Sequence, residues 1–117
     1  MARQPEVIAA RPSAAGFSLE LRVPPELEYF AGHFPGLPLL PGVVQIDWAV
    51  ALGRSRFELP PRCTHVAALK FMRVIEPGAM LALELSFDAG RGELGFSYRD
   101  AQGRECSSGR VGFSNDV

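Results

Sequence analysis

The chain has 117 residues, of which 47% are hydrophobic and 21% are charged, and this composition excludes a largely disordered or fibrous protein. Twelve basic residues against thirteen acidic ones give a formal net charge of -1, so no overall field attracts nucleic acid or a membrane surface. No stretch reaches the roughly 18 apolar residues that span a bilayer, and the N-terminus lacks a signal-peptide core. We therefore expect a cytoplasmic protein with one domain over residues 1–117.

The first elements follow from periodicity and from breaker residues. Apolar residues alternate loosely from Val7 to Val23, at the period of two that is typical of a strand with one buried face, and predict a strand that ends at Pro24-Pro25. The Gly- and Pro-rich stretch from Glu26 to Pro41 predicts a shaped loop, in which Leu27–Phe30 could form one helical turn.

A helix is predicted directly after this loop. Pro41 can occupy the first turn of a helix, and the sequence VVQIDWAVALGRSRF that follows Gly42 has no breaker before Gly53. The segment is apolar around nearly its whole circumference, so we expect the rest of the protein to enclose it.

Three or four strands are predicted after a loop over Glu58–Arg62. Short Gly- or Pro-bearing links of the kind that join antiparallel strands separate them. The candidate strands are His65–Ile75, Met80–Ala89, Glu93–Arg99 and Cys106–Ser114. This order of elements predicts an α+β fold in which a curled antiparallel sheet wraps around a central buried helix.

His33 is the first residue that could carry chemistry. It lies within Gly32-His33-Phe34-Pro35-Gly36, where tight turns would hold the imidazole in one orientation, so it is a candidate base. A lone His that caps a turn or bonds the backbone is the commoner case, and both interpretations stay open at this point. For His65, at the start of a predicted strand, we expect a structural role only.

Asp47 is the second candidate, because it interrupts an otherwise apolar helix. A buried carboxylate there would carry a heavy desolvation cost unless it were hydrogen-bonded or protonated. The alternative is a helix that turns Asp47 to solvent beside Arg54, while Gln45 points to another face with a structural role.

The start of the helix is the third candidate. Unpaired N–H groups at Gly42 and Val43, with the positive end of the helix dipole, can stabilise a developing oxyanion, and a glycine lets a substrate approach the backbone. An imidazole, a carboxylate and a helix N-terminus are the parts needed to remove a proton beside a carbonyl and to expel a β-hydroxyl.

The run from Gly32 to Val43, continued by Gln45-Ile46-Asp47, resembles the 3-hydroxyacyl-acyl carrier protein dehydratases of fatty acid synthesis. It reproduces the HFPG-x-P-x-x-PG block of that family and places the acidic residue fourteen positions after the His. Phe71-Met72-Arg73 followed by Pro77-Gly78 is similar to the family's strand and turn after the central helix. The order of elements matches over almost the full chain.

The resemblance implies one hot-dog dehydratase domain over residues 1–117, a hydro-lyase without metal or cofactor. It also implies a dimer in which His33 of one subunit meets Asp47 of the other, while the Gly42 N–H polarises the thioester carbonyl and the Leu39 carbonyl orients His33. The substrate would be a 3-hydroxyacyl thioester carried on the phosphopantetheine of acyl carrier protein, and the product a trans-2-enoyl thioester.

An acyl chain would lie in an apolar tunnel beside the helix, and an acidic carrier protein would dock on exposed arginines near its mouth. The candidate lining residues, each more often plain core, are Phe34, Leu39, Val43, Trp48 and Phe71. The candidate docking residues, each of which has a solvated surface role as its default, are Arg54, Arg56, Arg73 and Arg99.

Two positions in the helix distinguish branches of the family or depart from its pattern. Asp47 stands where the commoner branch has Glu and where the branch with an added isomerase activity has Asp, and Ala51 stands where the family usually has Gln. Asp47-Trp48 and the compact length are similar to dehydratases of aryl polyene and related lipid or polyketide clusters.

Alternatives to the dehydratase stay open. They are a noncatalytic acyl-thioester binding subunit of a heterodimeric dehydratase, and a thioesterase on the hot-dog fold. A homodimer is expected, with a heterodimer as the alternative. The two cysteines, Cys63 and Cys106, lie far apart without metal-ligand spacing, so we expect neither a disulfide nor a zinc site.

Overall fold

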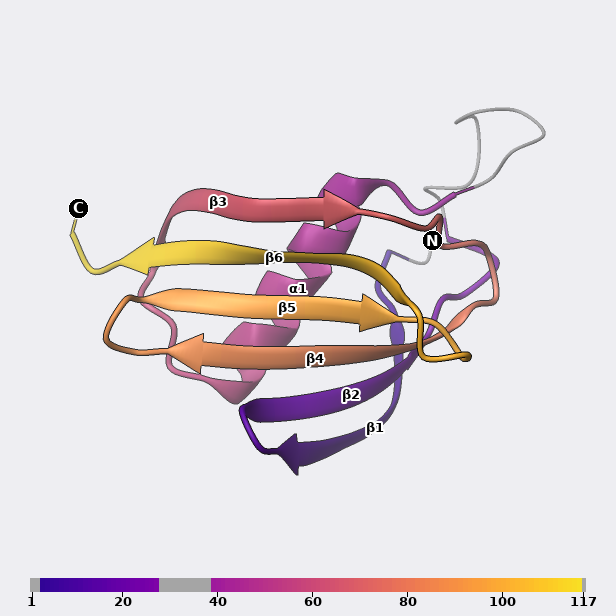
Figure 1. Cartoon of the computed structure of the whole chain (residues 1–117), viewed down its shortest axis with the longest axis horizontal. Coiled ribbons are helices and arrows are strands. Elements are labelled where there is room, and N and C mark those ends of the chain that lie inside the picture. Colours follow the sequence, from indigo (N-terminus) through magenta and orange to yellow (C-terminus); the bar gives the residue numbers. More distant parts are fainter. Residues whose placement is uncertain (1–2, 28–38, 117) are drawn as a thin grey trace.

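The computed structural model describes residues 3–27 and 39–116, and within them it contains six strands and one helix (Figure 1). The strands are β1 (Glu6–Ser13), β2 (Gly16–Arg22), β3 (Arg62–Phe71), β4 (Met80–Asp88), β5 (Glu93–Arg99) and β6 (Glu105–Ser114), and the helix is α1 (Gly42–Arg56). The helix and the last three strands agree with the predicted segments to within one or two residues.

The strands form a single antiparallel sheet in the order β1-β2-β4-β5-β6-β3. The sheet curls, and α1 lies across one of its faces (Figure 1). This arrangement confirms the predicted α+β fold. The first strand after the helix, β3, pairs with the last strand of the chain, β6, so the stretch around Phe71 lies beside Ser107.

The predicted single strand over Val7–Val23 is wrong, because this segment is a hairpin of β1 and β2. The turn falls at Ala14-Ala15, just before Gly16. Small residues without a Pro or a Gly pair gave no turn signal there. The predicted strand His65–Ile75 also ends early, at Phe71, because the Met72 and Arg73 N–H groups both turn to the Cys106 carbonyl. The helical turn considered for Leu27–Phe30 lies mostly outside the described residues.

The core fills the space between α1 and the concave face of the sheet. Its sheet side consists mainly of leucines from β2, β4 and β5, and α1 contributes Val44, Trp48 and Ala49. Trp48 is 2% exposed, and its Nε1–H donates to the Arg3 carbonyl at 3.0 Å. A buried indole N–H needs such a partner, so this bond lets Trp48 serve as a core residue.

The expectation that the protein encloses α1 holds on the sheet side only. Val43, Asp47 and Ala51 are exposed, and their spacing of four residues places them along one side of the helix. A six-stranded sheet from one chain covers one side of a helix, and the chain offers no second layer within the described residues. The other side of α1 is therefore open to a further protein surface.

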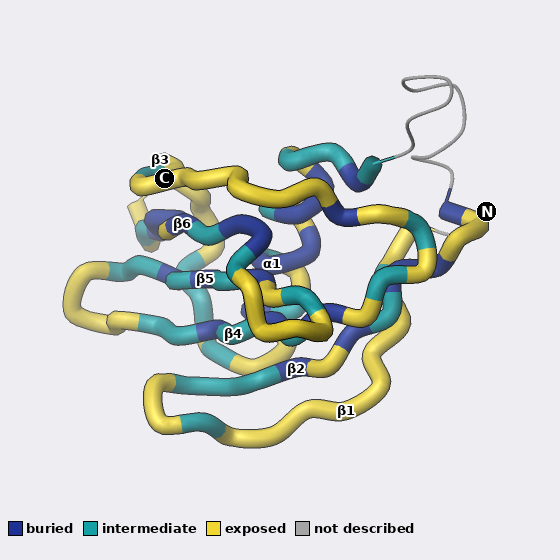
Figure 2. The backbone as a smooth tube through the Cα atoms, turned by 45° about the vertical axis from the view of Figure 1, so that its right-hand side comes forward, coloured by how far each residue is buried: buried dark blue, intermediate teal, exposed yellow. Residues whose placement is uncertain are grey.

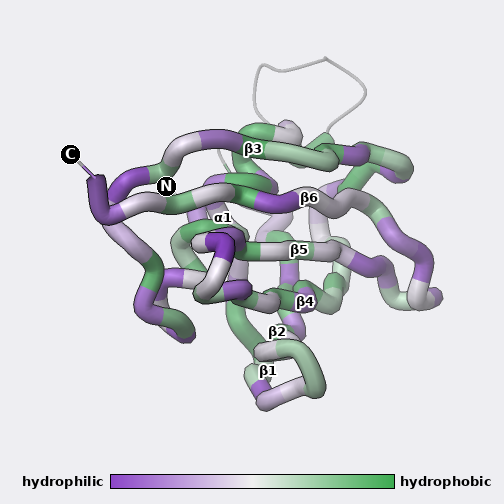
Figure 3. Tube along the Cα trace, turned by 60° about the vertical axis from the view of Figure 1, so that its left-hand side comes forward, coloured by the Kyte–Doolittle hydropathy of each residue, from purple (hydrophilic) through white to green (hydrophobic). Residues whose placement is uncertain are grey.

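The free edge strands are exposed along their length, as the yellow tube of β1 and β3 shows in Figure 2. Several of the exposed residues on β3 are apolar, and the hydrophobic parts of this strand are green in Figure 3. The large exposed hydrophobic residues on β3, after it and at the helix start are Val43, Val66, Leu69, Phe71, Met72 and Val74. The strand also carries a bulge between Ala67 and Lys70, where Ala68 has a φ of 53°. Among the described residues, no helix has the length and apolarity needed to cross a bilayer.

Candidate active site

A cavity of about 330 Å³ lies where the start of α1 meets the segment that ends β3. Leu39, Leu40, Gly42 and Gln45 line it on the helix side, and residues 71–74 line it on the strand side. Cavities of this size with mostly apolar walls and a few polar groups are typical binding sites for small molecules. The cavity therefore brings together four of the predicted site residues, which are Leu39, Gly42, Phe71 and Arg73.

The start of α1 supplies the polar groups of this cavity. Pro41 has the extended N-cap conformation without a side-chain cap, and its carbonyl accepts from the Val44 and Gln45 N–H groups at 3.1 and 3.2 Å. The N–H groups of Gly42 and Val43 precede these bonds and are not needed by the helical ladder. They carry the positive end of the helix dipole, which favours an anionic oxygen.

Packing against a distant side chain requires glycine at position 42, and the sequence did not reveal this contact. A Cβ atom at this position would lie 2.6 Å from Cζ of Phe71, a separation that carbon atoms do not tolerate. The Phe71 ring therefore lies directly over the helix start and uses the space that the glycine leaves. Since Phe71 is about half exposed, its ring forms one wall of the cavity and is not a fixed core residue.

Gln45 is a functional candidate that sequence reasoning missed. It is 4% exposed, its Nε2–H donates to the Leu40 carbonyl at 3.1 Å, and its Oε1 accepts from the Ser107 hydroxyl at 2.6 Å. The backbone carbonyl of Gln45 accepts from the Tyr98 hydroxyl at 2.7 Å. Burial raises the pKa of Tyr98 far above its usual range, so this hydroxyl stays protonated and donates. The feature of the sequence that could have identified Gln45 was its amide side chain within an otherwise apolar helix.

Asp47 lies on the open side of α1, away from this cavity. It is exposed, and no hydrogen bond or ion pair of its carboxylate is present within residues 3–27 and 39–116. The second interpretation from the sequence, a carboxylate turned to solvent, is the one that a single chain adopts. His33 and Phe34 lie outside the described residues, so their relation to Asp47 stays a prediction.

Two of the predicted lining residues do not line the cavity. Val43 is 65% exposed on the open side of α1, and Trp48 lies in the core beneath the helix. Helix geometry explains both positions. Val43 is rotated by about 100° around the helix axis from Gly42, so it occupies a different side of the helix, and Trp48 lies more than one turn further along the helix.

The four candidate docking arginines are spread over the molecule. Arg54 and Arg56 lie at the C-terminal end of α1, where Arg54 donates to the carbonyls of Leu59, Pro60 and Pro61 at 3.2 to 3.5 Å. Arg99 donates to the Gly103 carbonyl at 3.2 Å. Arg73 alone of the four lines the cavity, and no hydrogen bond or ion pair of its guanidinium occurs in the described part of the chain.

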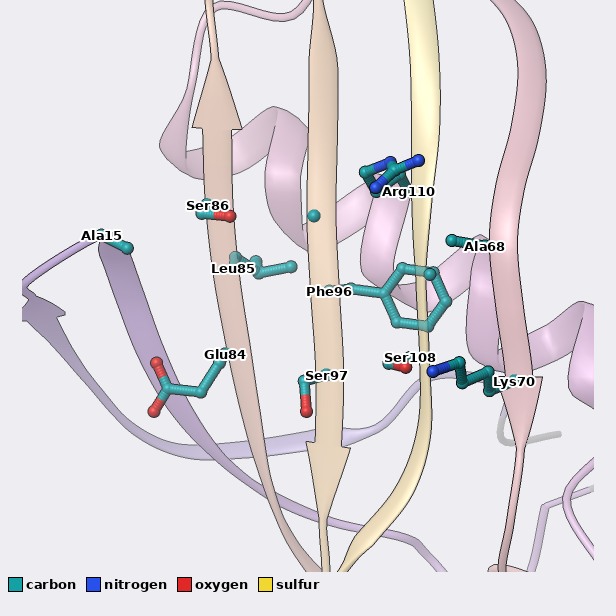
Figure 4. Close-up of a pocket in the computed structure, with 12 residues that line it drawn as sticks. Ala15, Ala68, Lys70, Glu84, Leu85, Ser86, Phe96, Ser97, Ser108 and Arg110 are labelled. Atoms are coloured by element: carbon teal, nitrogen blue, oxygen red, sulfur yellow. The ribbon is translucent and has the colours of Figure 1, made fainter.

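A second hollow, of about 430 Å³, lies over β4, β5 and β6. Figure 4 shows Glu84 of β4 and Ser97 of β5 on neighbouring strands and Lys70 on β3, beyond β6, with α1 behind the sheet. Glu84 alternates along β4 with the core leucines, so Glu84 and its cross-strand partners lie on the face of the sheet away from the helix. The hollow contains none of the candidate site residues.

The remaining sequence predictions concern His65 and metal ions. His65 Nε2 lies 3.6 Å from a Glu93 carboxylate oxygen, and its Nδ1 lies 2.9 Å from the Thr64 hydroxyl. These contacts are those of a surface residue on an edge strand, in agreement with a structural role. In the described segments, no three His, Cys, Asp or Glu side chains form a group that could hold a metal ion.

Comparison with known proteins gives the same assignment at the level of the family. A family model described as ApeI-like, ApeI dehydratase, matches residues 9–110. The 3-hydroxyacyl-[acyl-carrier-protein] dehydratase FabZ of Erythrobacter litoralis is 36% identical over 76 residues, which are 57% of this chain and 50% of that protein. The same-named protein of Clostridium perfringens is 30% identical over 95 residues, 74% of this chain and 68% of that protein. The chain thus spans only about half the length of the Erythrobacter relative.

Two solved structures share the fold. An uncharacterized protein from Erwinia carotovora subsp. atroseptica superposes with a TM-score of 0.82 at 34% identity, covering 92% of this chain and 94% of that one. The dehydratase heterocomplex ApeI:P from Xenorhabdus doucetiae gives a TM-score of 0.82 at 31% identity, covering 93% and 96%. These likenesses confirm the hot-dog fold. Since the family model covers nearly the whole sheet and the helix, the chain belongs to the ApeI-like family of dehydratases.

Proposed function

We propose that this chain is a 3-hydroxyacyl-[acyl carrier protein] dehydratase, with residues 1–117 as one catalytic domain. The observation that carries the proposal is the cavity at the start of α1, which combines helix N–H groups with apolar walls. An enolate oxygen needs hydrogen-bond donors such as these N–H groups, and an acyl chain needs apolar walls. The His33 motif and the family membership support the same reaction.

The reaction is a β-elimination in which no redox change occurs. His33 takes the α-proton of the thioester, and the electron pair left on the α-carbon is delocalised onto the carbonyl oxygen, where the Gly42 N–H and the helix dipole stabilise it. As the Cα–Cβ double bond forms, the bond from the β-carbon to its hydroxyl breaks, and the hydroxyl leaves as water with a proton that it receives through Asp47. The proton on His33 then returns to Asp47 through solvent.

Asp47 reaches the cavity from a second chain in this proposal. The open side of α1 carries Asp47 and exposed Val43. The end of β3 and the segment after it carry exposed Phe71, Met72 and Val74. An exposed apolar edge strand needs a cover, and a second copy pairing through β3 supplies one while joining the two sheets. A homodimer is proposed, and a heterodimer with a related chain is the alternative because one solved relative is described as a heterocomplex.

The assay that tests the function uses the purified chain and 3-hydroxyacyl carrier proteins of several chain lengths. Mass spectrometry of the carrier should show the loss of one water, and the conjugated enoyl product should absorb in the ultraviolet. Release of free acid would assign a thioesterase instead, and an unchanged substrate with every carrier tested would favour a noncatalytic subunit.

The substrate class is proposed to be that of aryl polyene or related polyketide synthesis. The Asp47-Trp48 pair and the match to the ApeI-like model favour it over general fatty acid synthesis. Carrier proteins loaded with aryl and with alkyl 3-hydroxyacyl groups of equal length test this point, and a higher kcat/KM for the alkyl series would contradict it.

Arg73 is proposed as the docking residue for the acidic carrier protein, because it is the candidate arginine at the cavity. Arg73→Glu should raise KM for the loaded carrier about tenfold, equivalent to ~1.4 kcal/mol, with little change in kcat. Steady-state kinetics at two salt concentrations measures this, since the loss should shrink as salt screens the charges. Arg56→Glu at the far end of α1 is the matched control, and equal losses in both variants would remove Arg73 from the docking site.

A further inference from the structure

We infer that Gln45 is a positioning residue, whose side chain ties Ser107 of β6 to Leu40 and so fixes the place of the Gly42 N–H at the cavity. This inference rests on the proposed function for its catalytic consequence. Its structural part, that Gln45 sets the start of α1, stands on hydrogen bonds that can be tested separately.

The sheet presents the groups that Gln45 binds in one row. Tyr98 of β5 and Ser107 of β6 are cross-strand partners, and Ser107 is in turn the partner of Phe71 on β3. All three side chains meet the first turns of α1, since Phe71 packs on Gly42 while Tyr98 and Ser107 bond to Gln45. One row of the sheet thus sets both the walls of the cavity and the position of the helix start.

The side chain of Gln45 holds the turn that precedes the helix. Its Oε1 is fixed by the Ser107 hydroxyl at 2.6 Å, and its Nε2–H donates to the Leu40 carbonyl at 3.1 Å. The N–H of Leu40 donates in the opposite direction, to the Ile75 carbonyl at 2.8 Å. Leu40 is therefore held on both sides, two residues before Gly42.

Tyr98 holds the helix backbone itself. Its hydroxyl donates to the carbonyl of Gln45 at 2.7 Å. In the described residues no buried side-chain N or O atom lacks a hydrogen-bond partner. Each polar side-chain atom of Gln45 and Ser107 therefore has a partner within the fold, either in the other side chain or in the Leu40 carbonyl. Their contribution is geometric, which is the role of a positioning residue.

An apolar pair at positions 45 and 107 would serve the core about as well on stability grounds alone. Gln45 is buried among Val44, Trp48 and Ala49, and replacing a buried polar pair by apolar groups of similar shape is often nearly neutral for folding. The position of the helix start is different, because a displacement of the reacting groups by about 1 Å can cost roughly 10²-fold in rate.

The test compares Gln45→Leu and Ser107→Ala with the control Ser108→Ala, which removes a hydroxyl from the next residue on the opposite face of β6. Gln45→Leu should lower kcat about tenfold to a hundredfold with KM nearly unchanged. Ser107→Ala should lower kcat in the same direction, and Ser108→Ala should leave it as in the wild type. The amide resonance of Gly42 in a ¹H–¹⁵N spectrum should move in the first two variants and stay in the third.

Several outcomes would overturn the inference. They are a wild-type kcat in Gln45→Leu, a Gly42 resonance that stays in place, or a loss of kcat that only follows the unfolded fraction in a melting curve. If Gln45→Leu does not fold, Ser107→Ala decides by the same two measurements. If the wild-type chain shows no dehydration, the proposed function fails, while the Gly42 resonance still decides whether Gln45 positions the helix start.

Discussion

His33→Ala and Asp47→Asn are each expected to lower the rate of dehydration by about 10²- to 10⁴-fold, the usual contribution of an acid or base group. Without the imidazole the α-proton has no acceptor, and Asn cannot protonate the leaving hydroxyl. Enoyl formation from a 3-hydroxyacyl carrier protein measures both losses. Asp47 is exposed, so its substitution should change the free energy of unfolding by only about 0.5 kcal/mol or less.

Mixing the two inactive variants should restore activity. If each site takes His33 from one chain and Asp47 from the other, a mixed dimer has one site with both groups intact and one with neither. Random exchange makes half of the dimers mixed, so roughly a quarter of the wild-type rate should return in a symmetric dimer. The mixture would stay inactive if both groups served the same chain, or if the working partner were a different protein.

Gly42→Ala is expected to lower kcat/KM by about 10²-fold, because the new Cβ displaces either the Phe71 ring or the helix start by the order of 1 Å. The added atom would lie 2.6 Å from Cζ of Phe71. Helix propensity favours alanine over glycine by about 1 kcal/mol, so the free energy of unfolding should change little. Kinetics and thermal melting of the same sample separate the two effects.

A second substitution identifies the collision as the cause. Phe71→Leu shortens the side chain that meets position 42, so the Gly42→Ala/Phe71→Leu chain should recover part of the activity lost in Gly42→Ala. The two single variants complete a double-mutant cycle. If the two side chains compete for the same space, the double variant should lose less activity than the sum of the two single losses. Additive losses would show that Gly42 is needed for the approach of the substrate instead.

The sequence predicted most local structure because local signals were strong. The helix needed only Pro41 before it and an unbroken apolar run, and the strands β4 to β6 were each bounded by Gly or Pro links. The HFPG-x-P-x-x-PG block indicated the family that the comparisons confirm. The hairpin at Ala14-Ala15 was missed because its turn residues carry no such signal.

The sequence by itself determined the helix and the last three strands, the family and the candidate acid and base, since each depends on residues close together in the chain. The tertiary structure alone decided that β3 returns to pair with β6, that Asp47 lies on the open side of α1, and that Gln45 meets Tyr98 and Ser107, which are 53 and 62 residues away. The physical reason is that strand pairing brings distant residues into contact, and a period of two or of 3.6 residues says which face a residue occupies but not which strand will lie beside it.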